Sequence, residues 1–437
     1  MELTSRVEEM DLALGRALRS GGRHCDLVRT AGMGRAVRTR SGRILGDRVS
    51  QSDQLCVRVW RENGIGTASG RGVSAHGLVR AALHGVSPRQ FPIRPADPAG
   101  APDPALNPDP GDPPDPVEAA AQCEALVTAA GGRLIQCQVA WEQWVNEAVA
   151  STGLRVRWHR QVIELTCLFQ VGDSHSHFKI RGTAWDRPAI AAALGWAAHL
   201  ARVPVRAASE GSGRKLPVVL APEAAAAVMT VVAAARRADW VAEGLSCLGG
   251  QPGDAIAGAA LTVVDDPSLP GAGRRAFDAE GAACRPVLLV DQGRLAGCLY
   301  TLAAADAYGA PGSWRGGNAF RWEHADLPYP AISTLRIQAA GAGGDMLTAA
   351  PDAWLITEFH SLSAEAAATG LVSARVAAYR VRRGEVQYQA AAPAVSFSLP
   401  EWLLGVCGQI GVHVLCAGGV SAQSPHLLVE GMELTGI

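Results

Sequence analysis

Three histidines form the arrangement in this sequence that best suits a metal ion. His175 and His177 are two residues apart, so on a β-strand their side chains share one face. His159 lies on the segment expected to pair with that strand, and Asp173 lies in the turn between the two segments. Imidazole and carboxylate groups are common zinc ligands. One hypothesis is a stand-alone metal-dependent hydrolase that uses His159, His175 and His177, and the alternative is that these histidines are solvated beside a polar turn.

A second pair of side chains suits general acid–base chemistry. Glu358 and His360 are also two residues apart and would present a carboxylate and an imidazole on one strand face. Ser361 and Ser363 follow them, but no strand–turn–helix elbow surrounds either serine, as a nucleophile would need. No HExxH, HExxxH, P-loop or GxSxG motif occurs in the chain. A structural role for the pair is the alternative.

The cysteines give no recognisable metal motif. The chain has 10 cysteines, and none of them forms a CxxC pair. A loose group near the C-terminus matches no zinc spacing and consists of Cys407, His413, Cys416 and His426. Residues 1–18 contain several acidic side chains and no continuous apolar core, so they do not resemble a secretion signal. These features predict a cytoplasmic protein with reduced, buried thiols.

Composition excludes two classes of partner. Of the 437 residues, 48% are hydrophobic and 19% are charged, which is a globular profile. The 40 basic and 41 acidic side chains leave a net charge of −1, so no global field attracts nucleic acid or an anionic membrane. The most apolar stretch, Ala221–Ala235, is shorter than a membrane span. We therefore expect no nucleic-acid partner and no membrane partner.

Strands and helices are needed to bring the candidate residues together. Asn63-Gly64 predicts a hairpin turn, because both residues tolerate a positive φ. Residues 154–171 and 175–182 predict two strands joined by a short turn. Helix starts are predicted at residues whose side chains can cap them, and these are Ser74, Asp115 and Asp186, with a capping box at Ser5 and Glu8.

The pattern of helical and strand-like segments changes near residue 215, which predicts two domains and an α+β fold. Residues 1–214 predict an N-terminal α/β sandwich-like domain that contains a proline-rich connector at residues 91–116. Residues 215–437 contain one long Ala-rich helix, Pro222–Ala242, followed mostly by short apolar runs broken by glycines. This second pattern predicts an antiparallel β-sheet or barrel-like domain with a long helix.

Two neighbouring motifs carry a resemblance to a known family. Val263–Gly271 reads VVDDPSLPG, and Phe277–Gly281 reads FDAEG. Together they resemble the signature of the TldD/PmbA family, in which a strand runs into DDP-(S/T)-LPG and then FD-x-EG. Weaker similarities follow in the same order along the chain, at Gly64–Ser69, Val287–Val290, Gly297–Leu302, Gly317–Ala319, Leu355–Glu358, Gly370–Ser373, Tyr379–Val386 and Pro425–Glu430.

The resemblance is to the TldE side of that family. TldD-type subunits carry HExxxH on a helix, have a cysteine near the C-terminus and bind a metal, whereas TldE-type subunits lack this set and pair with a TldD-type partner. On the comparable helix here, the metal-facing positions would be Thr230, Val231 and Ala235, which offer a divalent ion poor ligands or none. Cys416 lies where the cysteine ligand would fall, and alone it cannot hold zinc.

The resemblance implies a catalytically incomplete subunit of a metallopeptidase heterodimer, with no metal or catalytic residues of its own. Zinc or a similar divalent metal is expected in a TldD-like, HExxxH-containing partner. The substrate would be a peptide or a modified precursor peptide that undergoes proteolytic maturation and is held as an added β-strand. Polar and aromatic residues in otherwise apolar segments are the candidate substrate contacts, namely Trp314, Arg315, Asn318, Arg321, Trp322, Glu358, His360 and Ser373. A non-enzymatic peptide-binding scaffold is a further alternative.

The chain also departs from the TldE pattern. The arginine that usually follows the serine of the GDxS motif is replaced by Ala374, and Arg375 comes one position later. The stretch after Glu358 lacks the family's glycine-rich sequence. These departures indicate a divergent member of the family.

Overall fold

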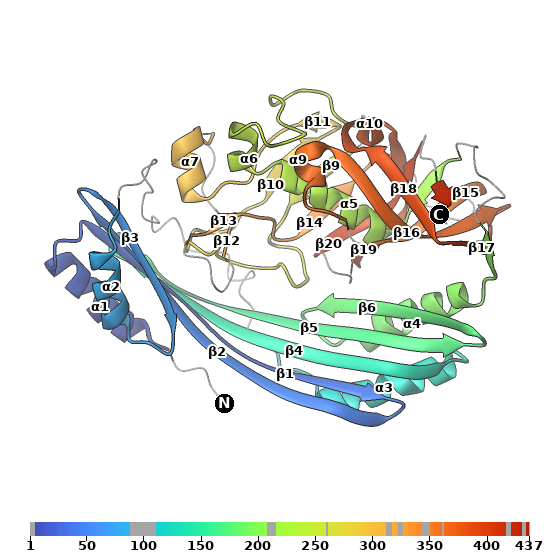
Figure 1. Cartoon of the computed structure of the whole chain (residues 1–437), viewed down its shortest axis with the longest axis horizontal. Helices are drawn as coiled ribbons and strands as arrows, with labels where there is room; N and C mark the ends of the chain where they lie inside the picture. Colours follow the sequence, from blue (N-terminus) through green and yellow to red (C-terminus); the bar gives the residue numbers. More distant parts are fainter. Residues whose placement is uncertain are drawn as a thin grey trace.

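Two large β-sheets make up the molecule, and the N-terminal sheet curves beneath the rest of the chain (Figure 1). This computed structural model describes residues 5–87, 111–207, 216–258, 261–311, 317–321, 327–341, 350–360, 362–416, 421–430 and 434–436. Residues 91–110 of the predicted proline-rich connector lie outside these ranges. The mixture of helices and strands confirms the predicted α+β class.

The first sheet is antiparallel throughout, with strand order β3-β2-β1-β4-β5-β6. Its strands are β1 (His24–Arg40), β2 (Arg43–Arg61), β3 (Gly64–Arg71), β4 (Arg133–Ala150), β5 (Arg155–Val171) and β6 (Ser174–Gly182). The predicted hairpin at Asn63-Gly64 is confirmed as the β2–β3 turn. The two strands predicted at 154–171 and 175–182 are confirmed as β5 and β6.

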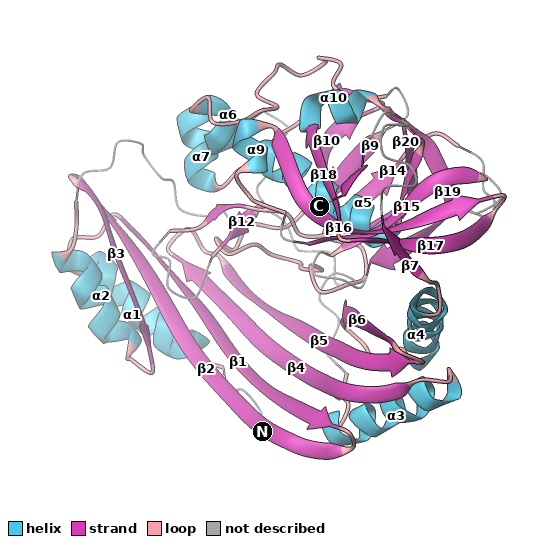
Figure 2. Cartoon of the chain, turned by 45° about the vertical axis from the view of Figure 1, so that its right-hand side comes forward, coloured by secondary structure: helices cyan, strands magenta, loops and turns pink. Residues whose placement is uncertain are grey.

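Four helices cover the outer face of this sheet (Figure 2). They are α1 (Val7–Arg19), α2 (Ala75–His84), α3 (Pro116–Ala129) and α4 (Arg187–Ala201). The pleat explains the division of faces, because alternate residues point to opposite sides of a strand. Leu27, Leu55 and Val149 pack under α1 and α2, whereas Val139 and Leu165 pack under α3 and α4.

Three of the predicted helix caps are confirmed. Ser74 Oγ accepts a hydrogen bond from Gly77 N at 3.1 Å, and Asp186 Oδ1 accepts one from Ala189 N at 3.0 Å. Asp115 Oδ1 accepts one from Val117 N at 2.8 Å. Each side chain satisfies an N–H group that the first helical turn leaves free.

The capping box predicted at Ser5 and Glu8 is wrong. Helix α1 begins at Val7 with no side-chain cap, and the Ser5 hydroxyl donates instead to Glu147 Oε1 of β4 at 2.6 Å. Glu147 is completely buried, and an ionised group in a protein interior needs hydrogen-bond donors. The Ser5 side chain therefore binds this distant carboxylate and does not cap the helix.

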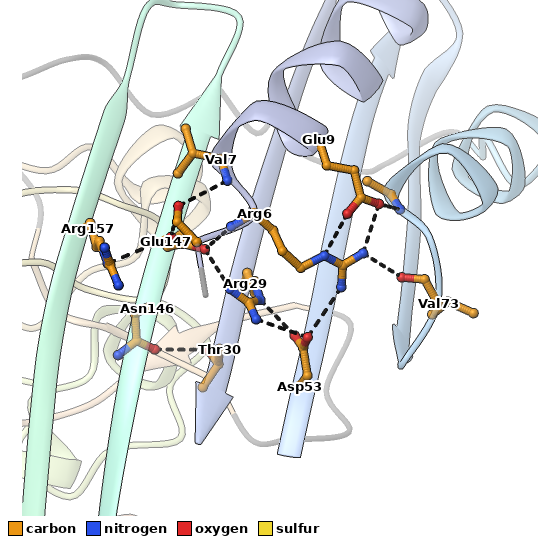
Figure 3. Close-up of polar contacts among 12 residues, drawn as sticks. Arg6, Val7, Glu9, Arg29, Thr30, Asp53, Val73, Asn146, Glu147 and Arg157 are labelled. Carbon is orange, nitrogen blue, oxygen red and sulfur yellow. Dashed lines mark hydrogen bonds and ion pairs between the residues drawn. The ribbon is translucent and has the colours of Figure 1, made fainter. Parts of the chain in front are cut away.

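Glu147 belongs to a charge network that fixes α1 on the sheet (Figure 3). Arg29 donates to Glu147 Oε2 at 2.9 Å and to both oxygens of Asp53 at 2.8 and 3.0 Å. Arg6 pairs with Glu9 at 2.7 Å and lies 3.4 Å from Asp53. Arg29 is 4% exposed, so its charge is buried between α1 and the sheet. The cost of burying it is offset because it is paired with carboxylates.

The second sheet has thirteen strands drawn from the described part of residues 205–436. They are β7 (Val205–Ala207), β8 (Val218–Leu220), β9 (Thr262–Asp265), β10 (Val287–Asp291), β11 (Arg294–Leu295), β14 (Leu335–Gln338), β15 (Asp352–His360), β16 (Leu371–Arg382), β17 (Glu385–Ala391), β18 (Pro393–Ser398), β19 (Val406–Cys416), β20 (Ala422–Val429) and β21 (Leu434–Gly436). Most pairs are antiparallel as predicted, but β14–β20, β15–β8 and β17–β7 are parallel.

The helix predicted at Pro222–Ala242 is in fact two helices, α5 (Pro222–Ala235) and α6 (Ala238–Ala242). Arg236 lies at the break, with 1% exposure, and its guanidinium donates to Gly297 O at 3.0 Å and Leu248 O at 2.5 Å. The buried cation takes its acceptors from other segments, and the chain turns there. Helix α5 is enclosed by the main hydrophobic core of the second half.

The remaining described elements are one short ribbon and three helices. They are the ribbon β12 (Ala319–Phe320) and β13 (Tyr329–Pro330), with helices α7 (Leu302–Tyr308), α9 (Ala366–Thr369) and α10 (Leu399–Leu404). The inner face of the first sheet packs against residues around Phe277, whose ring lies 5.5 Å from that of Trp158. None of the helices in the described ranges is both long enough and apolar enough to cross a bilayer.

Candidate functional site

A buried charge cluster joins the first sheet to the second half of the chain. Arg58 of β2 donates to Asp26 Oδ2 of β1 at 2.5 Å and to Glu280 Oε1 at 3.0 Å. The other oxygen of Glu280 accepts a hydrogen bond from Leu302 N at 2.8 Å, at the start of α7. Exposure of all three charged side chains is 4% or less. The FDAEG segment, which contains Glu280, therefore has a structural role at the contact between the two halves.

Asp278, in the same segment, organises the backbone around it. Its Oδ1 accepts from Glu280 N and Ala282 N at 2.9 and 3.0 Å, and its Oδ2 accepts from Gly317 N and Ala319 N at 3.1 and 3.0 Å. Burial and the neighbouring Glu280 raise the pKa of Asp278 to about 6, although these backbone hydrogen bonds oppose the shift. Asp278 therefore fixes the position of the β12 segment.

Asp265, in the preceding VVDDPSLPG segment, is also structural. Its Oδ1 accepts from Ser333 N and Ser333 Oγ at 2.7 and 2.6 Å, and its Oδ2 accepts from Asn318 Nδ2 at 3.0 Å. Burial raises the pKa of Asp265, while the nearby Arg275 and these hydrogen bonds oppose that change. The two motifs thus tie together segments that are distant in sequence.

A cavity of about 220 Å³ lies between these segments and the inner face of the first sheet. Its charged and aromatic lining consists of Trp144, Trp158, Arg160, Arg275, Phe277, Asp278, Phe320 and Arg321. Trp144 lies directly over β1, where a Cβ atom on Gly32 would come within 2.4 Å of Trp144 Cδ1. A glycine at position 32 therefore gives the indole its place in the wall.

Positive charge predominates in this cavity. Among the described lining residues, three are arginines and one, Asp278, is a carboxylate. Arg160 donates to Ala272 O at 3.1 Å, and its guanidinium carbon lies 5.3 Å from the Trp144 ring centroid. Burial, together with the neighbouring cations Arg275 and Arg181, lowers the pKa of Arg160 to about 10. The Nε atom of Arg275 is buried and has no hydrogen-bond acceptor among the described residues.

A second contact between the halves brings Glu358 and His360, the predicted acid–base pair, next to His177, a predicted metal ligand. His177 Nε2 of β6 lies 3.3 Å from Glu358 Oε2 of β15, and His360 Nδ1 lies 3.5 Å from Glu358 Oε1. A hydrogen bond from His177 is the largest influence lowering the pKa of Glu358, and the same contact raises the pKa of His177. All three side chains are about half exposed. The group bridges the two sheets.

The predicted three-histidine cluster is wrong. In the β-sheet register His177 lies opposite Leu168 and His175 opposite Gln170, whereas His159 lies opposite Val145 on the other neighbour of β5. His159 is therefore nine positions from the residue opposite His177, roughly 30 Å along the strand. One ion cannot contact all three imidazoles.

The helix positions compared with the family's metal motif contain no strong donor. Thr230 Oγ1 donates to Ala226 O at 2.9 Å, and Val231 and Ala235 are buried hydrocarbon side chains. Cys416 is buried, and burial raises the pKa of its thiol. Cys407 is exposed, and the side chain of His413 lies outside what the structure describes.

Three buried thiols were missed by sequence reasoning. The sulfur atoms of Cys123, Cys137 and Cys167 lie within 4.8 Å of one another, between α3 and strands β4 and β5. In the described ranges this is the one group of three His, Cys, Asp or Glu side chains at such distances. The residues packed around it are apolar, an environment that disfavours thiolate. Cysteines from a helix and two strands leave no spacing signal in the sequence.

The candidate substrate contacts fall into several groups. Glu358 and His360 are together, and Ser373 of β16 lies opposite Ser396, beyond the end of β15. Arg321 lines the cavity, and Asn318 is fully buried against Asp265. Trp314, Arg315 and Trp322 lie outside the described residues.

The other cavity residues were not predicted as a site. Trp144, Trp158 and Arg160 are separated by more than a hundred residues from Arg275 and Phe277. Alternation along β4 and β5 predicts a shared face for the first group, but only the tertiary fold brings the second group to it.

Residues 212–436 match the family model for the "PmbA/TldA metallopeptidase C-terminal domain". A protein from Methanothermobacter thermautotrophicus named "Metalloprotease" is 33% identical over 113 residues, which are 26% of this chain. The match spans 24%, or about a quarter, of that relative's length.

Solved structures with a similar fold cover nearly the whole chain. TldE from Thermococcus kodakarensis superposes with a TM-score of 0.83 at 14% identity, covering 98% of this chain and 100% of that one. A proposed modulator of DNA gyrase from Thermotoga maritima gives a TM-score of 0.81 at 15% identity, with coverages of 99% and 100%. A similarly described protein from Bacteroides thetaiotaomicron gives 0.74 at 16% identity, with 100% of both chains covered. These likenesses show the fold.

Proposed function

This chain belongs to the PmbA/TldD family of metallopeptidases, and we propose that within it the chain is a TldE-type subunit that binds no catalytic metal itself. Its partner would be a TldD-like, HExxxH-containing subunit that supplies zinc or a similar divalent ion and the activated water. This chain would hold a peptide or a modified precursor peptide during proteolytic maturation in the cytoplasm.

The observation that carries this proposal is the chemistry of α5. Val231 and Ala235 have no donor atom, and the Thr230 hydroxyl is used within the helix. Zinc in proteins takes thiolate, imidazole or carboxylate ligands, so these three positions cannot form its site. The group of described residues at metal-ligand distances is the cysteine trio, which lies in the first half of the chain.

A free strand edge supports the substrate-holding role. Strand β8 pairs with β15 only at Trp354–Ile356, because the chain leaves β8 at Leu220 to enter α5. In the described residues no strand lies beside Thr357–His360 on that edge. An extended peptide can add to such an edge through backbone hydrogen bonds, with Glu358 and His360 beside it.

Purification alone and with the partner tests the proposal. The chain alone should bind little zinc and hydrolyse no peptide, and co-expression with an HExxxH chain should give a complex that cleaves peptide. Stoichiometric zinc with hydrolysis by the lone chain would contradict the proposal. Peptide binding without cleavage, even with the partner present, would instead favour a non-enzymatic scaffold.

Peptide analogues test whether the substrate adds as a strand. A strand that joins this edge pairs through the backbone groups of alternate residues only. N-methylation of one alternate set of peptide nitrogens should therefore reduce cleavage by the complex, and N-methylation of the other set should leave cleavage largely intact. Equal effects of the two sets would contradict strand addition.

A further inference from the structure

We infer that the cavity between the first sheet and the FDAEG segment binds a carboxylate of the substrate peptide. This inference rests on the proposed function, because it specifies which group of the peptide this chain recognises. Three guanidinium groups line the cavity, from Arg160, Arg275 and Arg321, against a single carboxylate, Asp278.

The one acidic group of the lining is already engaged. Both oxygens of Asp278 accept backbone hydrogen bonds, two each, from the segments that it holds in place. It forms no ion pair with a cavity arginine in the described structure. The carboxylate of Asp278 therefore serves the fold and leaves net positive charge in the cavity.

Cations outweigh anions around Arg160, where Arg275 and Arg181 each act more strongly on its guanidinium than the carboxylate of Glu142 does. Arg160 and Arg275 repel each other electrostatically, and Arg160 contacts a backbone carbonyl and the face of Trp144. Arg275 donates to Ala331 O at a long 3.4 Å and keeps its Nε without an acceptor among the described residues. Cations drawn into a partly buried space lose hydration, and an incoming anion would restore the lost interactions.

The shape and walls favour a carboxylate attached to an amino-acid residue. A guanidinium presents its donors in a planar fork that matches the two oxygens of a carboxylate. Trp144, Trp158, Phe277 and Phe320 supply apolar walls beside the cations. A volume of about 220 Å³ admits a residue or so of a peptide, and no folded partner. An acidic side chain and a C-terminal carboxylate share this chemistry.

Isothermal titration calorimetry with unlabelled, N-acetylated peptides distinguishes the two sources. Three short peptides of one sequence would differ only in their charge: one ends in a free carboxylate, one ends in an amide, and one ends in an amide and carries an internal Glu in place of Gln. We expect the chain to bind one carboxylate form roughly tenfold more tightly than the neutral amide form, as charge-assisted hydrogen bonds allow. The tighter form identifies the source.

Matched variants assign the effect to the cavity. Arg160→Gln and Arg275→Gln should each remove most of that preference. Arg35→Gln, on the outer face of the sheet and paired with Asp47, should leave the preference intact. Equal affinity for all three peptides, or loss of preference in Arg35→Gln alone, would overturn the carboxylate assignment and leave the peptide-holding function standing. Absence of binding to every peptide, in the chain and in its complex, would overturn both.

Discussion

Arg58 and Glu280 form an ion pair of 3.0 Å between residues 222 positions apart, with neither side chain more than 1% exposed. Arg58 is held in turn by Asp26, and Glu280 by the first N–H of α7. The pair therefore connects the curved sheet to the segment that lines the cavity.

Breaking this pair should destabilise the protein strongly. Glu280→Gln leaves the buried Arg58 with one counter-charge fewer, and loss of a partner in a buried pair costs about 3–5 kcal/mol. The free energy of unfolding from urea titration measures the effect. Arg35 and Asp47 form an exposed pair of 2.8 Å, so Asp47→Asn should cost far less. Similar losses for both substitutions would contradict a buried role for the Arg58–Glu280 pair.

Acid should weaken the attachment of α1. Burial acts to raise the pKa of Glu147 and of Asp53, but hydrogen bonds from Ser5 and Arg29 outweigh it and lower both pKa values. A carboxyl with a lowered folded pKa stabilises above its unfolded pKa, roughly 4, and loses that stabilisation as pH falls through the folded value. Urea titrations between neutral and acid pH should show the loss, and Glu147→Gln should reduce the slope. A slope unchanged by Glu147→Gln would exclude this carboxyl as its source.

The stabilisation from the contact between His177 and Glu358 should be lost as the pH rises, whereas the stabilisation from Glu147 is lost as the pH falls. The raised pKa of His177 means that its contribution is complete below roughly 6.5 and is lost as pH rises through the folded value. The lowered pKa of Glu358 keeps its contribution present above roughly 4.5. The link should therefore be strongest in mildly acidic solution and be worth about 0.2–1 kcal/mol, because both groups are half exposed.

Comparison of the wild type with His177→Gln measures that contribution. The difference in unfolding free energy should be largest in mildly acidic buffer and vanish in alkaline buffer. His175→Gln, at a position of the same strand opposite Gln170, is the control variant. A difference that is constant with pH would show that the link is not ionic.

Gly281 is required by both backbone and space. Its φ is +81°, and a Cβ there would lie 2.6 Å from Leu154 Cδ2. Gly172 has a positive φ of +58° with nothing within 4 Å of such a Cβ. Gly172→Ala should therefore cost only the backbone strain, about 1 kcal/mol, while Gly281→Ala should add about 1–3 kcal/mol of overpacking. Thermal unfolding of the two variants tests whether the crowding is real, and equal losses would show that it is not.

Thiol reactivity should follow exposure and leave the cysteine trio unmodified. Cys407 is exposed, whereas Cys123, Cys137 and Cys167 are buried among apolar residues. Burial raises the pKa of Cys407, so its labelling by iodoacetamide should be slow but still first, as mass spectrometry of peptides can show. The trio should react only after denaturation. Early modification of Cys137 in the native protein would mean that α3 opens readily.

Local chemistry predicted the elements that have local causes. Asn63-Gly64 gave the β2–β3 hairpin, and Asp115 and Asp186 capped their helices, because turns and caps depend on neighbouring residues. Strand β1 and the first part of β2 were not recognised. Residues 43–51 of β2 are exposed, so they lack the alternation that marks a half-buried strand.

Long-range contacts defined what the pattern could not. His175 and His177 share a face of β6, as their spacing indicates. His159 is distant from them because it lies near the start of β5, a strand of 17 residues, whereas β6 begins beside the end of that strand. Glu358 acquired His177 from the other sheet, and the cavity arginines come from both halves. Such groupings depend on how two sheets pack, which is a property of the whole chain.

Glu280 divides its two oxygens between the halves of the molecule, one for Arg58 and one for the start of α7. If the chain were produced as two fragments divided between the sheets, Arg58 in one fragment and Glu280 in the other would each lose its partner. Each charge would then lie on an exposed surface that normally packs against the other half. The halves should consequently dissolve and fold better when co-produced than when made singly, and recombination of the fragments should restore the native circular dichroism spectrum.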